Sequence, residues 1–396
     1  MLLTSRLFML FSFFILLSCH NNDDIEDNDS QQNMKQIIDN TAQNIIELHI
    51  NNSVIKCIEE IVLFRNNLYR PIFRIPSIMI TNQGSYLLSC ENRQSIEDKG
   101  KIDLIITKKE KNSSLWTSSV IYRHNSTNGR AMNPVFLIDR VGAHDYIGRI
   151  YLFSCHIVDN VYAFNSTTKN TDFVYRYSDD DGNNWSKEYS LKHLWNDDEY
   201  TAVIPSASNG IQLLDGTLLL PTMVIKNATY RSGLLIKRPN EDWKFSSPSP
   251  IDGDNECTVY TDNHNNIILD CRTFSTLRHK YVYDLVTDTY SMMSSNFNVG
   301  VALKAEVTRM EFEGTNIYLS SFPNTTSNKR ENLSLWASKD SHDWEIITQF
   351  KKGSVDGAYS NVYYYNNQLV LTYETMKDIR VIDLSPILND IKLHFK

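Results

Sequence analysis

The most regular feature of the sequence is a succession of short apolar or alternating segments, separated by turns rich in Asn, Asp and Gly. From about Asp39 onward, no long stretch shows the hydrophobic period of an amphipathic helix. Segments of this length and spacing are typical of strands in an antiparallel meander. The expected strands include Ile78–Leu88, Ile102–Thr107, Ile150–His156, Gly216–Val224 and Gln368–Tyr373.

The composition favours strands and a globular body. Aromatic residues make up 11% of the chain, led by 21 Tyr and 17 Phe, and such side chains suit a pleated, half-buried surface. The hydrophobic share of 41% is ordinary for globular proteins, and 396 residues are ample for a core. Because 47 acidic residues outnumber 39 basic ones, the net charge of −8 argues against nucleic acid as a partner. We therefore expect an all-β protein.

The N-terminus has the features of an export signal. Arg6 precedes an apolar run from Leu7 to Leu17, which is too short to span a bilayer comfortably. The order Leu16-Leu17-Ser18-Cys19 resembles the bacterial lipobox, in which the cysteine becomes the lipid-bearing first residue of the mature chain. The acidic stretch Asp23–Asp29 follows and is expected to form a solvated tether.

These features divide the chain into three parts. Residues 1–18 are expected to be a signal peptide, residues 19–38 a lipid-attached flexible tether, and residues 39–396 a single folded domain. The protein would be exported and anchored by its N-terminal lipid at the bacterial cell surface or outer membrane. The alternative is an ordinary signal peptide with an incidental Cys19, which would give a secreted protein.

The cysteines do not have the spacing of a metal site. After Cys19 the chain has cysteines at positions 57, 90, 155, 257 and 271, with no CxxC motif and no His cluster. Cys257 and Cys271 flank the turn-rich segment Asp262–Asn266. In a symmetric hairpin these two residues would face each other, and a disulfide between them is one possibility.

A repeated turn motif predicts the architecture. The segment Ser178–Trp185 fits the pattern Ser-x-Asp-x-Gly-x-x-Trp, which is the hairpin turn known as the Asp box. Weaker copies occur at Lys109–Trp116, Ile236–Trp243 and Ser338–Trp344. A period of roughly 50 to 60 residues, with a few strands in each unit, is typical of a β-propeller. We expect a six-bladed β-propeller of four-stranded antiparallel sheets, in which these turns have a structural role.

Several segments, in order along the chain, resemble the motifs of the bacterial sialidases. Phe73-Arg74-Ile75-Pro76 matches the FRIP motif of that family. Glu91–Asp98 resembles its segment with an arginine and then an aspartate. The other segments that resemble motifs of this family are Asn133–Asp139, Gly210–Leu218, Asn255–Cys257, Asp270–Arg272, Arg330–Trp336, Gly357–Ser360 and Leu371–Glu374.

The resemblance implies a role for each matching residue. Tyr359 would be the nucleophile, Glu256 the base that activates it, and Asp98 the acid/base. The substrate-binding residues would be Arg74, Arg93, Arg272 and Arg330, and Glu374 would brace Arg74. In the symmetric hairpin, Glu256 lies opposite Arg272.

The chemistry of sialic acid suits these residue types. Its anomeric carbon carries a carboxylate, and an arginine fork binds a carboxylate through two parallel hydrogen bonds. A carboxylate nucleophile would be repelled by that same charge, whereas a neutral tyrosine is not. Tyrosine is a known exception to the usual pair of glycosidase carboxylates. Asp98 would protonate the leaving oxygen and then activate water on the same face, so the outcome would be net retention of configuration.

Several alternatives remain open. Glu256 and Arg272 could form a plain cross-strand ion pair, Arg278 could be the second arginine, and Lys329 could replace Arg330. The leading expectation is an exo-α-sialidase without a cofactor, monomeric, which acts on sialylated glycoproteins, glycolipids or oligosaccharides. A trans-sialidase or a catalytically inactive glycan-binding propeller are the alternatives.

Overall fold

Short strands joined by turns make up most of the residues that the structure describes. The computed structural model describes residues 36–38, 43–50, 54–66, 71–124, 129–157, 171–195, 200–275, 277–293, 304–325, 330–350 and 359–396. All of these ranges belong to one unit, Met34–Lys396. The expected signal peptide, Cys19 and most of the expected tether lie outside the described residues. Within those residues, the all-β prediction is confirmed.

The largest sheet has nine strands and consists of two consecutive antiparallel meanders. One parallel pairing, between Ile102 and Arg130, joins them. The first meander contains β4 (Ile72–Ile80), β5 (Tyr86–Arg93), β6 (Ile102–Lys109) and β7 (Trp116–Tyr122). The second contains β8 (Arg130–Asp139), β9 (Arg149–Ile157), β10 (Thr171–Ser178) and β11 (Tyr189–Ser190). Strand β1 (Gln36–Ile38) pairs with β7, so pairing with the body begins inside the segment expected to be tether.

Three further antiparallel sheets follow in chain order. The first contains β12 (Ala202–Pro205), β13 (Ile211–Gln212), β14 (Leu218–Lys226), β15 (Thr229–Lys237) and β16 (Lys244–Phe245). The second contains β17 (Cys257–Thr261), β18 (Ile267–Cys271), β19 (His279–Asp284) and β20 (Thr289–Met293). The third contains β21 (Glu306–Phe312), β22 (Thr315–Pro323), β23 (Leu333–Ser338) and β24 (Glu345–Gln349).

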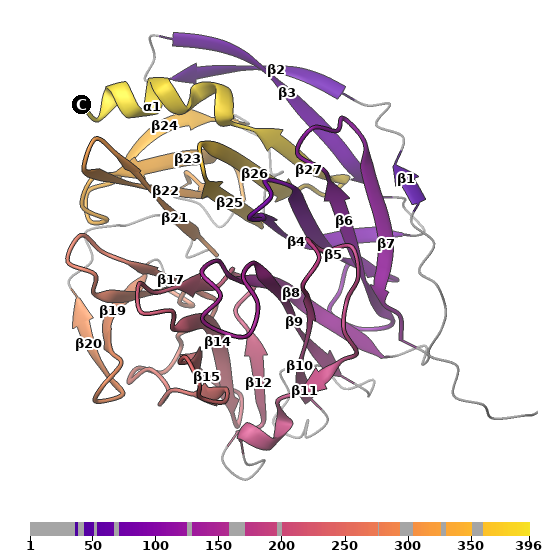
Figure 1. Ribbon diagram of the computed structural model, residues 1–396, viewed down its shortest axis with the longest axis vertical. Coiled ribbons are helices and arrows are strands. Elements are labelled where there is room, and N and C mark those ends of the chain that lie inside the picture. The colour runs from indigo at the N-terminus through magenta and orange to yellow at the C-terminus, as the bar shows by residue number, and fades with distance from the viewer. Residues whose placement is uncertain are drawn as a thin grey trace, which may run out of the picture. The chain divides into compact units, whose positions relative to one another are not determined.

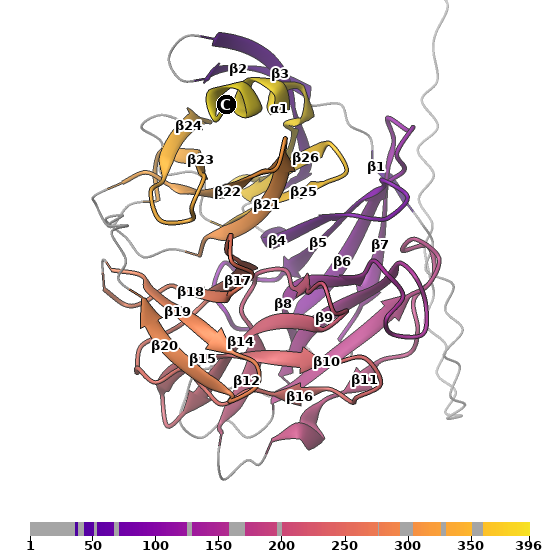
Figure 2. The same cartoon turned by 60° about the vertical axis from the view of Figure 1, so that its left-hand side comes forward.

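The last sheet combines strands from both ends of the described chain. It has the order β2 (Gln43–Ile50), β3 (Val54–Arg65), β27 (Asp378–Asp383), β26 (Gln368–Glu374) and β25 (Ser360–Tyr365). Figures 1 and 2 show β2 and β3 beside the C-terminal strands. One strand of each group contacts a strand of the next group: β25 contacts β4, β4 contacts β8, β8 contacts β14, β14 contacts β17, β17 contacts β21, and β21 contacts β25. The sheets therefore have a propeller-like arrangement.

Burial along the strands explains why the sequence pattern is partly alternating and partly continuous. Every residue of β8 is buried, because β8 contacts strands of the first meander on one side and β12, β13 and β14 of the next sheet on the other. The outer strand β20 has only exposed and half-buried residues. The middle of β8 accordingly has the apolar run Val135–Ile138 in place of an alternating pattern.

One segment that was expected to be a single strand folds as a hairpin of two strands. The segment Ile78–Leu88 contains the end of β4 at Ile80, a turn, and the start of β5 at Tyr86. Gly84 in this turn has a φ of 84°, a conformation that favours glycine. The prediction of a single strand was wrong because apolar residues on both sides concealed the turn.

The turn after β10 shows how the Ser-x-Asp-x-Gly sequence folds. Ser178 Oγ donates to Asp180 Oδ1 at 2.8 Å and accepts the N–H of Gly182 at 2.9 Å. Asp181 and Gly182 both have positive φ, at 62° and 79°. After β23, Asp340 Oδ1 likewise accepts a serine hydroxyl at 2.9 Å. These side chains stabilise turns and bring no reactive group to a site.

The sequence pattern did not predict the short helix at the C-terminus. Helix α1 (Leu388–His394) follows the 3-10 turn Ser385–Ile387, and another 3-10 turn is Lys192–Leu194. Leu388 and Ile391 are buried in the same cluster as strands β25 and β26. The helix was missed because it is too short to show a clear helical period. None of the described helices is long and apolar enough to cross a membrane.

Candidate active site

The predicted site residues lie at the ends of inner strands or in the loops beside them. Apart from Cys19, all of them are among the described residues. Arg74 is near the start of β4, Glu256 directly precedes β17, and Arg272 directly follows β18. Tyr359 directly precedes β25, and Glu374 is the last residue of β26. The sheets therefore bring residues from distant parts of the sequence to one place.

The hairpin of β17 and β18 has the predicted register. Cys257 pairs with Cys271 in the ladder, and a disulfide joins these two residues. One step beyond, the N–H of Arg272 donates to the carbonyl of Glu256 at 2.9 Å. The side chains also meet, with 2.7 Å between Arg272 Nη1 and Glu256 Oε2. The pairing of Glu256 opposite Arg272 is thus confirmed.

The other oxygen of Glu256 holds the hydroxyl group of Tyr359. Tyr359 Oη donates to Glu256 Oε1 at 2.6 Å, and Arg272 Nη1 lies 3.4 Å from the same hydroxyl. Burial raises the pKa of Tyr359, and the charge of Glu256 raises it further, while Arg272 and Arg330 oppose the shift. The hydroxyl is therefore protonated at neutral pH, and the group that could take its proton is already in contact with it.

Glu374 holds the first arginine and the strained backbone beside it. Its Oε1 accepts Arg74 Nη2 at 2.9 Å, and its Oε2 accepts the N–H of Ile75 at 2.8 Å. Ile75 has a φ of 53°, which is unusual for a β-branched residue and costs energy. Arg330 Nη1 lies 4.0 Å from the same carboxylate. One carboxylate thus braces two of the expected substrate-binding arginines.

Three guanidinium groups surround the tyrosine. Those of Arg74 and Arg330 lie 5.7 and 5.4 Å from the centre of the Tyr359 ring, and Arg272 contacts its hydroxyl. The side chains of Arg74, Arg272 and Arg330 are 17%, 21% and 34% exposed. They are therefore partly open to solvent, as groups that receive an anionic ligand must be.

Arg93 is in a different environment. Its side chain is 1% exposed, and its guanidinium group contacts the carboxylates of both Glu91 and Asp98. Arg93 Nη1 lies 2.6 Å from Asp98 Oδ1, whereas Asp98 itself is 32% exposed. The expectation that Arg93 binds substrate stays a prediction, and the observed contacts of its guanidinium group are with these two carboxylates. Burial and two carboxylate partners leave it better placed to orient Asp98.

The sequence reasoning gave no role to Glu91. This fully buried residue contacts Arg93 and accepts the N–H of Asn133 at 2.8 Å, so it connects β5 with β8. Burial raises the pKa of Glu91, and Arg93 opposes the shift. The two-residue spacing of Glu91 and Arg93 on one strand could have indicated the pair, because such residues share a face.

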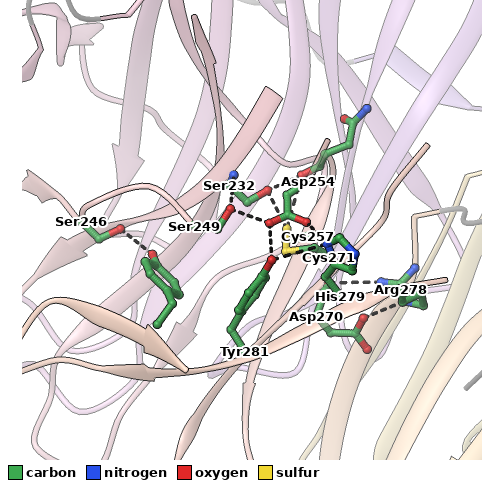
Figure 3. Close-up of a disulfide and its surroundings, with 12 residues drawn as sticks. Ser232, Ser246, Ser249, Asp254, Cys257, Asp270, Cys271, Arg278, His279 and Tyr281 are labelled. Atoms are coloured by element: carbon green, nitrogen blue, oxygen red, sulfur yellow. Dashed lines mark hydrogen bonds and ion pairs between the residues drawn. A yellow bond between two sulfur atoms is a disulfide. The ribbon is translucent and has the colours of Figure 1, made fainter. Parts of the chain in front are cut away.

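A buried aspartate holds the loop that leads to Glu256. Asp254 accepts Ser249 Oγ at 2.6 Å and Tyr281 Oη at 2.8 Å, and its other oxygen lies 2.7 Å from His279 Nδ1. Figure 3 shows these side chains gathered around Asp254 and next to the disulfide. Two residues further along the chain, Glu256 is therefore fixed from both sides, by this cluster and by the hairpin.

Arg278 does not take the place of the expected second arginine, Arg272. Arg278 is buried and donates to Asp270 Oδ1 at 2.6 Å, so it is held within the sheet (Figure 3). Lys329 lies outside the described residues. Across the described ranges, no group of three or more His, Cys, Asp or Glu side chains could hold a metal ion.

The arrangement has a definite chemical capacity. Three partly exposed guanidinium groups can bind a carboxylate. A tyrosine beside a carboxylate can act as a nucleophile with an adjacent base.

Solved structures share the fold of this chain. The Hadza microbial sialidase Hz136 has a TM-score of 0.69 at 19% identity, over 80% of this chain and 66% of that one. Trypanosoma rangeli sialidase in complex with sialic acid has a TM-score of 0.70 at 15% identity, over 91% of this chain and 60% of that one. The present chain thus spans less than two thirds of either protein.

Sequence comparison gives a relative of similar length. A sialidase from Clostridium perfringens is 24% identical over an alignment of 362 residues, which covers 83% of this chain and 93% of the relative. The family model of the BNR repeat-like domain matches residues 75–374, from the strained isoleucine of β4 to the carboxylate that ends β26. This chain therefore belongs to the BNR repeat-like domain family.

Proposed function

We propose that this protein is an exo-α-sialidase, which hydrolyses terminal sialic acids from glycoproteins, glycolipids or oligosaccharides with retention of configuration. The observation that carries the proposal is the 2.6 Å contact between Tyr359 Oη and Glu256 Oε1, with the three guanidinium groups around it. The names of the Clostridium perfringens relative and of the structural neighbours support the same substrate. The proposed reaction uses no cofactor.

Substrate binding is assigned to the arginine triad. Arg74, Arg272 and Arg330 come from three different sheets or the loops beside them, and their side chains are partly exposed. A sialic acid carboxylate would accept hydrogen bonds from their forks. Clustered cations repel one another, and Glu374 offsets this repulsion by its contacts with Arg74 and Arg330.

The nucleophile in this proposal is Tyr359. As its oxygen bonds to the anomeric carbon, its proton passes to Glu256 Oε1, and the bond to the leaving group breaks. The raised pKa of Tyr359 keeps the hydroxyl neutral until attack, so it does not repel the substrate carboxylate. Arg272 contacts both Glu256 and Tyr359, and its charge stabilises the negative charge that develops on the phenolic oxygen.

Asp98 completes the reaction as acid and then base. It protonates the leaving glycosidic oxygen in the first step and removes a proton from water in the second. As the water oxygen bonds to the anomeric carbon, the bond from that carbon to Tyr359 breaks, and Glu256 returns the proton to the phenolic oxygen. Its exposure of 32% allows contact with substrate and solvent, while Arg93 fixes its orientation. Arg93 is therefore a positioning residue in this scheme.

We further propose that the sheets form six blades. The nine-stranded sheet contributes two, because one residue pair alone links its two meanders, and each of the other four sheets contributes one. Contacts between consecutive inner strands return from β25 to β4, which closes the ring. The turns at Ser178–Trp185 and Ser338–Trp344 would then be Asp boxes between outer strands.

The same site would also suit a trans-sialidase. One structural neighbour is a leech intramolecular trans-sialidase, with a TM-score of 0.64 at 13% identity. Both reactions use the same nucleophile, base and acid, and they differ in the acceptor. Hydrolysis is the primary proposal, and product analysis with and without a galactoside acceptor separates the two.

The cellular location is a separate proposal. The lipobox-like order Leu16-Leu17-Ser18-Cys19 supports lipid attachment at Cys19 and display at the bacterial cell surface or outer membrane. A surface location would bring the enzyme to extracellular glycans.

The first prediction tests the nucleophile. The purified protein is expected to release a fluorogenic leaving group from an α-sialoside, and Tyr359→Phe is expected to lower kcat by about a thousandfold or more. The variant keeps the ring but loses the hydroxyl, so its melting temperature should change little. Steady-state kinetics and thermal unfolding measure both. An unchanged rate in the variant would show that another group attacks, and an inactive wild type would leave only a glycan-binding role.

The second prediction tests the fork of Arg272. Arg272→Lys keeps the charge but loses one of two parallel hydrogen bonds, which contribute on the order of 1.5 to 3 kcal/mol each. Calorimetry should show binding of an unsaturated sialic acid analogue weakened by roughly ten- to a hundredfold.

Arg278→Lys is the matched control for this prediction. Arg278 is bound to Asp270 within the sheet, so its replacement should leave the affinity for the analogue unchanged. If Arg278→Lys abolished binding and Arg272→Lys did not, the assignment of the second arginine would be wrong.

The third prediction tests the anchor. Cys19→Ala removes the sulfur to which lipid would attach, and the protein should then leave the membrane fraction for the soluble fraction. Fractionation of cells that express either form, with immunoblotting, measures this shift. Continued membrane partition of the variant would refute lipid attachment at Cys19.

A further inference from the structure

A buried lysine contacts the backbone of the residue that follows the proposed nucleophile. The side chain of Lys304 is 2% exposed, and its Nζ donates to the backbone carbonyl of Ser360 at 2.9 Å. Ser360 is the residue after Tyr359 and the first residue of β25. A buried ammonium group is costly, so its presence at this point calls for an explanation in its contacts.

The carbonyl of Ser360 needs such a donor because of its place in the sheet. Strand β25 is an edge strand, with β26 as its sheet neighbour. Ser360 lies opposite Tyr373, and the ladder bond before this pair runs from the N–H of Glu374 to the carbonyl of Tyr359, at 2.9 Å. Ser360 is therefore in a non-hydrogen-bonded pair, and its carbonyl points away from β26. Lys304 stabilises this edge carbonyl, which would otherwise be buried without a strand partner.

Glu306 is the ion-pair partner of Lys304. The distance between Lys304 Nζ and Glu306 Oε2 is 3.5 Å, and Glu306 Oε1 accepts the N–H of Asn209 at 3.1 Å. Burial raises the pKa of Glu306 to about 7, and Lys304 opposes this shift. The lysine is thus held by a carboxylate that is itself fixed to a neighbouring sheet.

Asn209 connects this pair to further inner strands. Its Oδ1 accepts Ser77 Oγ at 2.6 Å and the N–H of Phe136 at 3.0 Å, while its Nδ2 donates to the carbonyl of Ile78 at 2.7 Å. These contacts lie on β4 and β8, and Glu306 lies on β21. Lys304 therefore holds β25 against a buried polar network that spans several sheets.

Lys304 also lies within electrostatic reach of the site carboxylates. Burial lowers the pKa of Lys304, and the negative charges of Glu306, Glu256 and Glu374 oppose that shift. Glu256 and Glu374 are the two carboxylates that hold Tyr359 and the arginines. Unlike Lys304, Arg74, Arg272 and Arg330 are partly exposed.

We propose that Lys304 is a positioning residue for the nucleophile: it fixes the backbone of Tyr359 and Ser360, so that the tyrosine hydroxyl stays directed at Glu256 and at the anomeric carbon. This inference rests on the proposed function, because it assigns Lys304 a part in that same reaction. Lys304 touches no substrate atom, so its loss should act on the rate of the chemical step more than on substrate binding.

Lys280 provides a matched control. Its side chain is also 2% exposed, its Nζ donates to the carbonyl of Ser341 at 2.9 Å, and it lies 3.6 Å from Asp270 Oδ2. Lys280 thus has the same burial, the same kind of acceptor and the same kind of ion pair, but it does not contact the segment that carries Tyr359. Replacement of either lysine by methionine removes a buried ammonium group with its carbonyl contact and its ion pair, although Asp270 keeps Arg278 as a partner.

The experiment compares Lys304→Met with Lys280→Met and the wild type. For Lys304→Met we expect kcat to fall by about ten- to a hundredfold, with KM and the affinity for an unsaturated sialic acid analogue within about threefold of the wild type. Lys280→Met should lower the melting temperature by a similar amount and leave kcat within about twofold of the wild type. Parallel losses of rate and analogue affinity in Lys304→Met, or equal rate losses in both variants, would overturn the proposal.

A second measurement does not depend on turnover. Amide hydrogen exchange of the peptide that contains Tyr359, Ser360 and Asn361 should be faster in Lys304→Met and unchanged in Lys280→Met. Unchanged exchange in Lys304→Met would overturn the proposal. If the wild type itself does not hydrolyse sialosides, the proposed function fails, and exchange at this peptide still decides whether Lys304 positions Tyr359. If Lys304→Met does not fold, Lys304→Gln replaces it in both measurements, with smaller effects in the same direction.

Discussion

The carboxylate of Glu256 joins the tyrosine hydroxyl to the guanidinium group of Arg272, with one oxygen for each. This contact depends on the hairpin of β17 and β18, whose register places Glu256 opposite Arg272, and on the disulfide next to both residues. It also depends on the start of β25, which carries Tyr359. Three separate strands must therefore be correctly placed before the proposed nucleophile meets its base.

The rest of the site repeats the principle that a fixed carboxylate holds a cation. Glu374 braces Arg74 and Arg330, and Arg93 holds Asp98 while Glu91 holds Arg93. Each of the three clustered arginines has a carboxylate partner, so their guanidinium groups can lie close together without a large cost from electrostatic repulsion. Glu91, Arg93 and Asp98 are close in sequence, whereas Glu374, Arg74 and Arg330 come from segments that are distant in sequence. The propeller-like arrangement is what brings this second group together.

Residue types and local order in the sequence predicted much of this site. The symmetric spacing of Glu256, Cys257, Cys271 and Arg272 was enough to predict the hairpin register, because pairing along two strands follows from one turn. Burial could not be predicted in the same way: Arg93 was expected to bind substrate, but neighbouring strands enclose it. The role of Lys304 was also absent from the sequence pattern, since its contacts come from residues that are adjacent only after the sheets have closed.

The proposed reaction depends on attack of Tyr359 on the anomeric carbon while Glu256 takes its proton. Incubation with a 2,3-difluorinated sialic acid, which forms a long-lived glycosyl-enzyme, followed by mass spectrometry of proteolytic peptides, identifies the attacking residue. We expect a covalent adduct on the peptide that contains Tyr359, with fragment ions that place it on the tyrosine, and no adduct in Tyr359→Phe. An adduct on Glu256 or Asp98, or substrate turnover without any adduct, would show that Tyr359 is not the nucleophile.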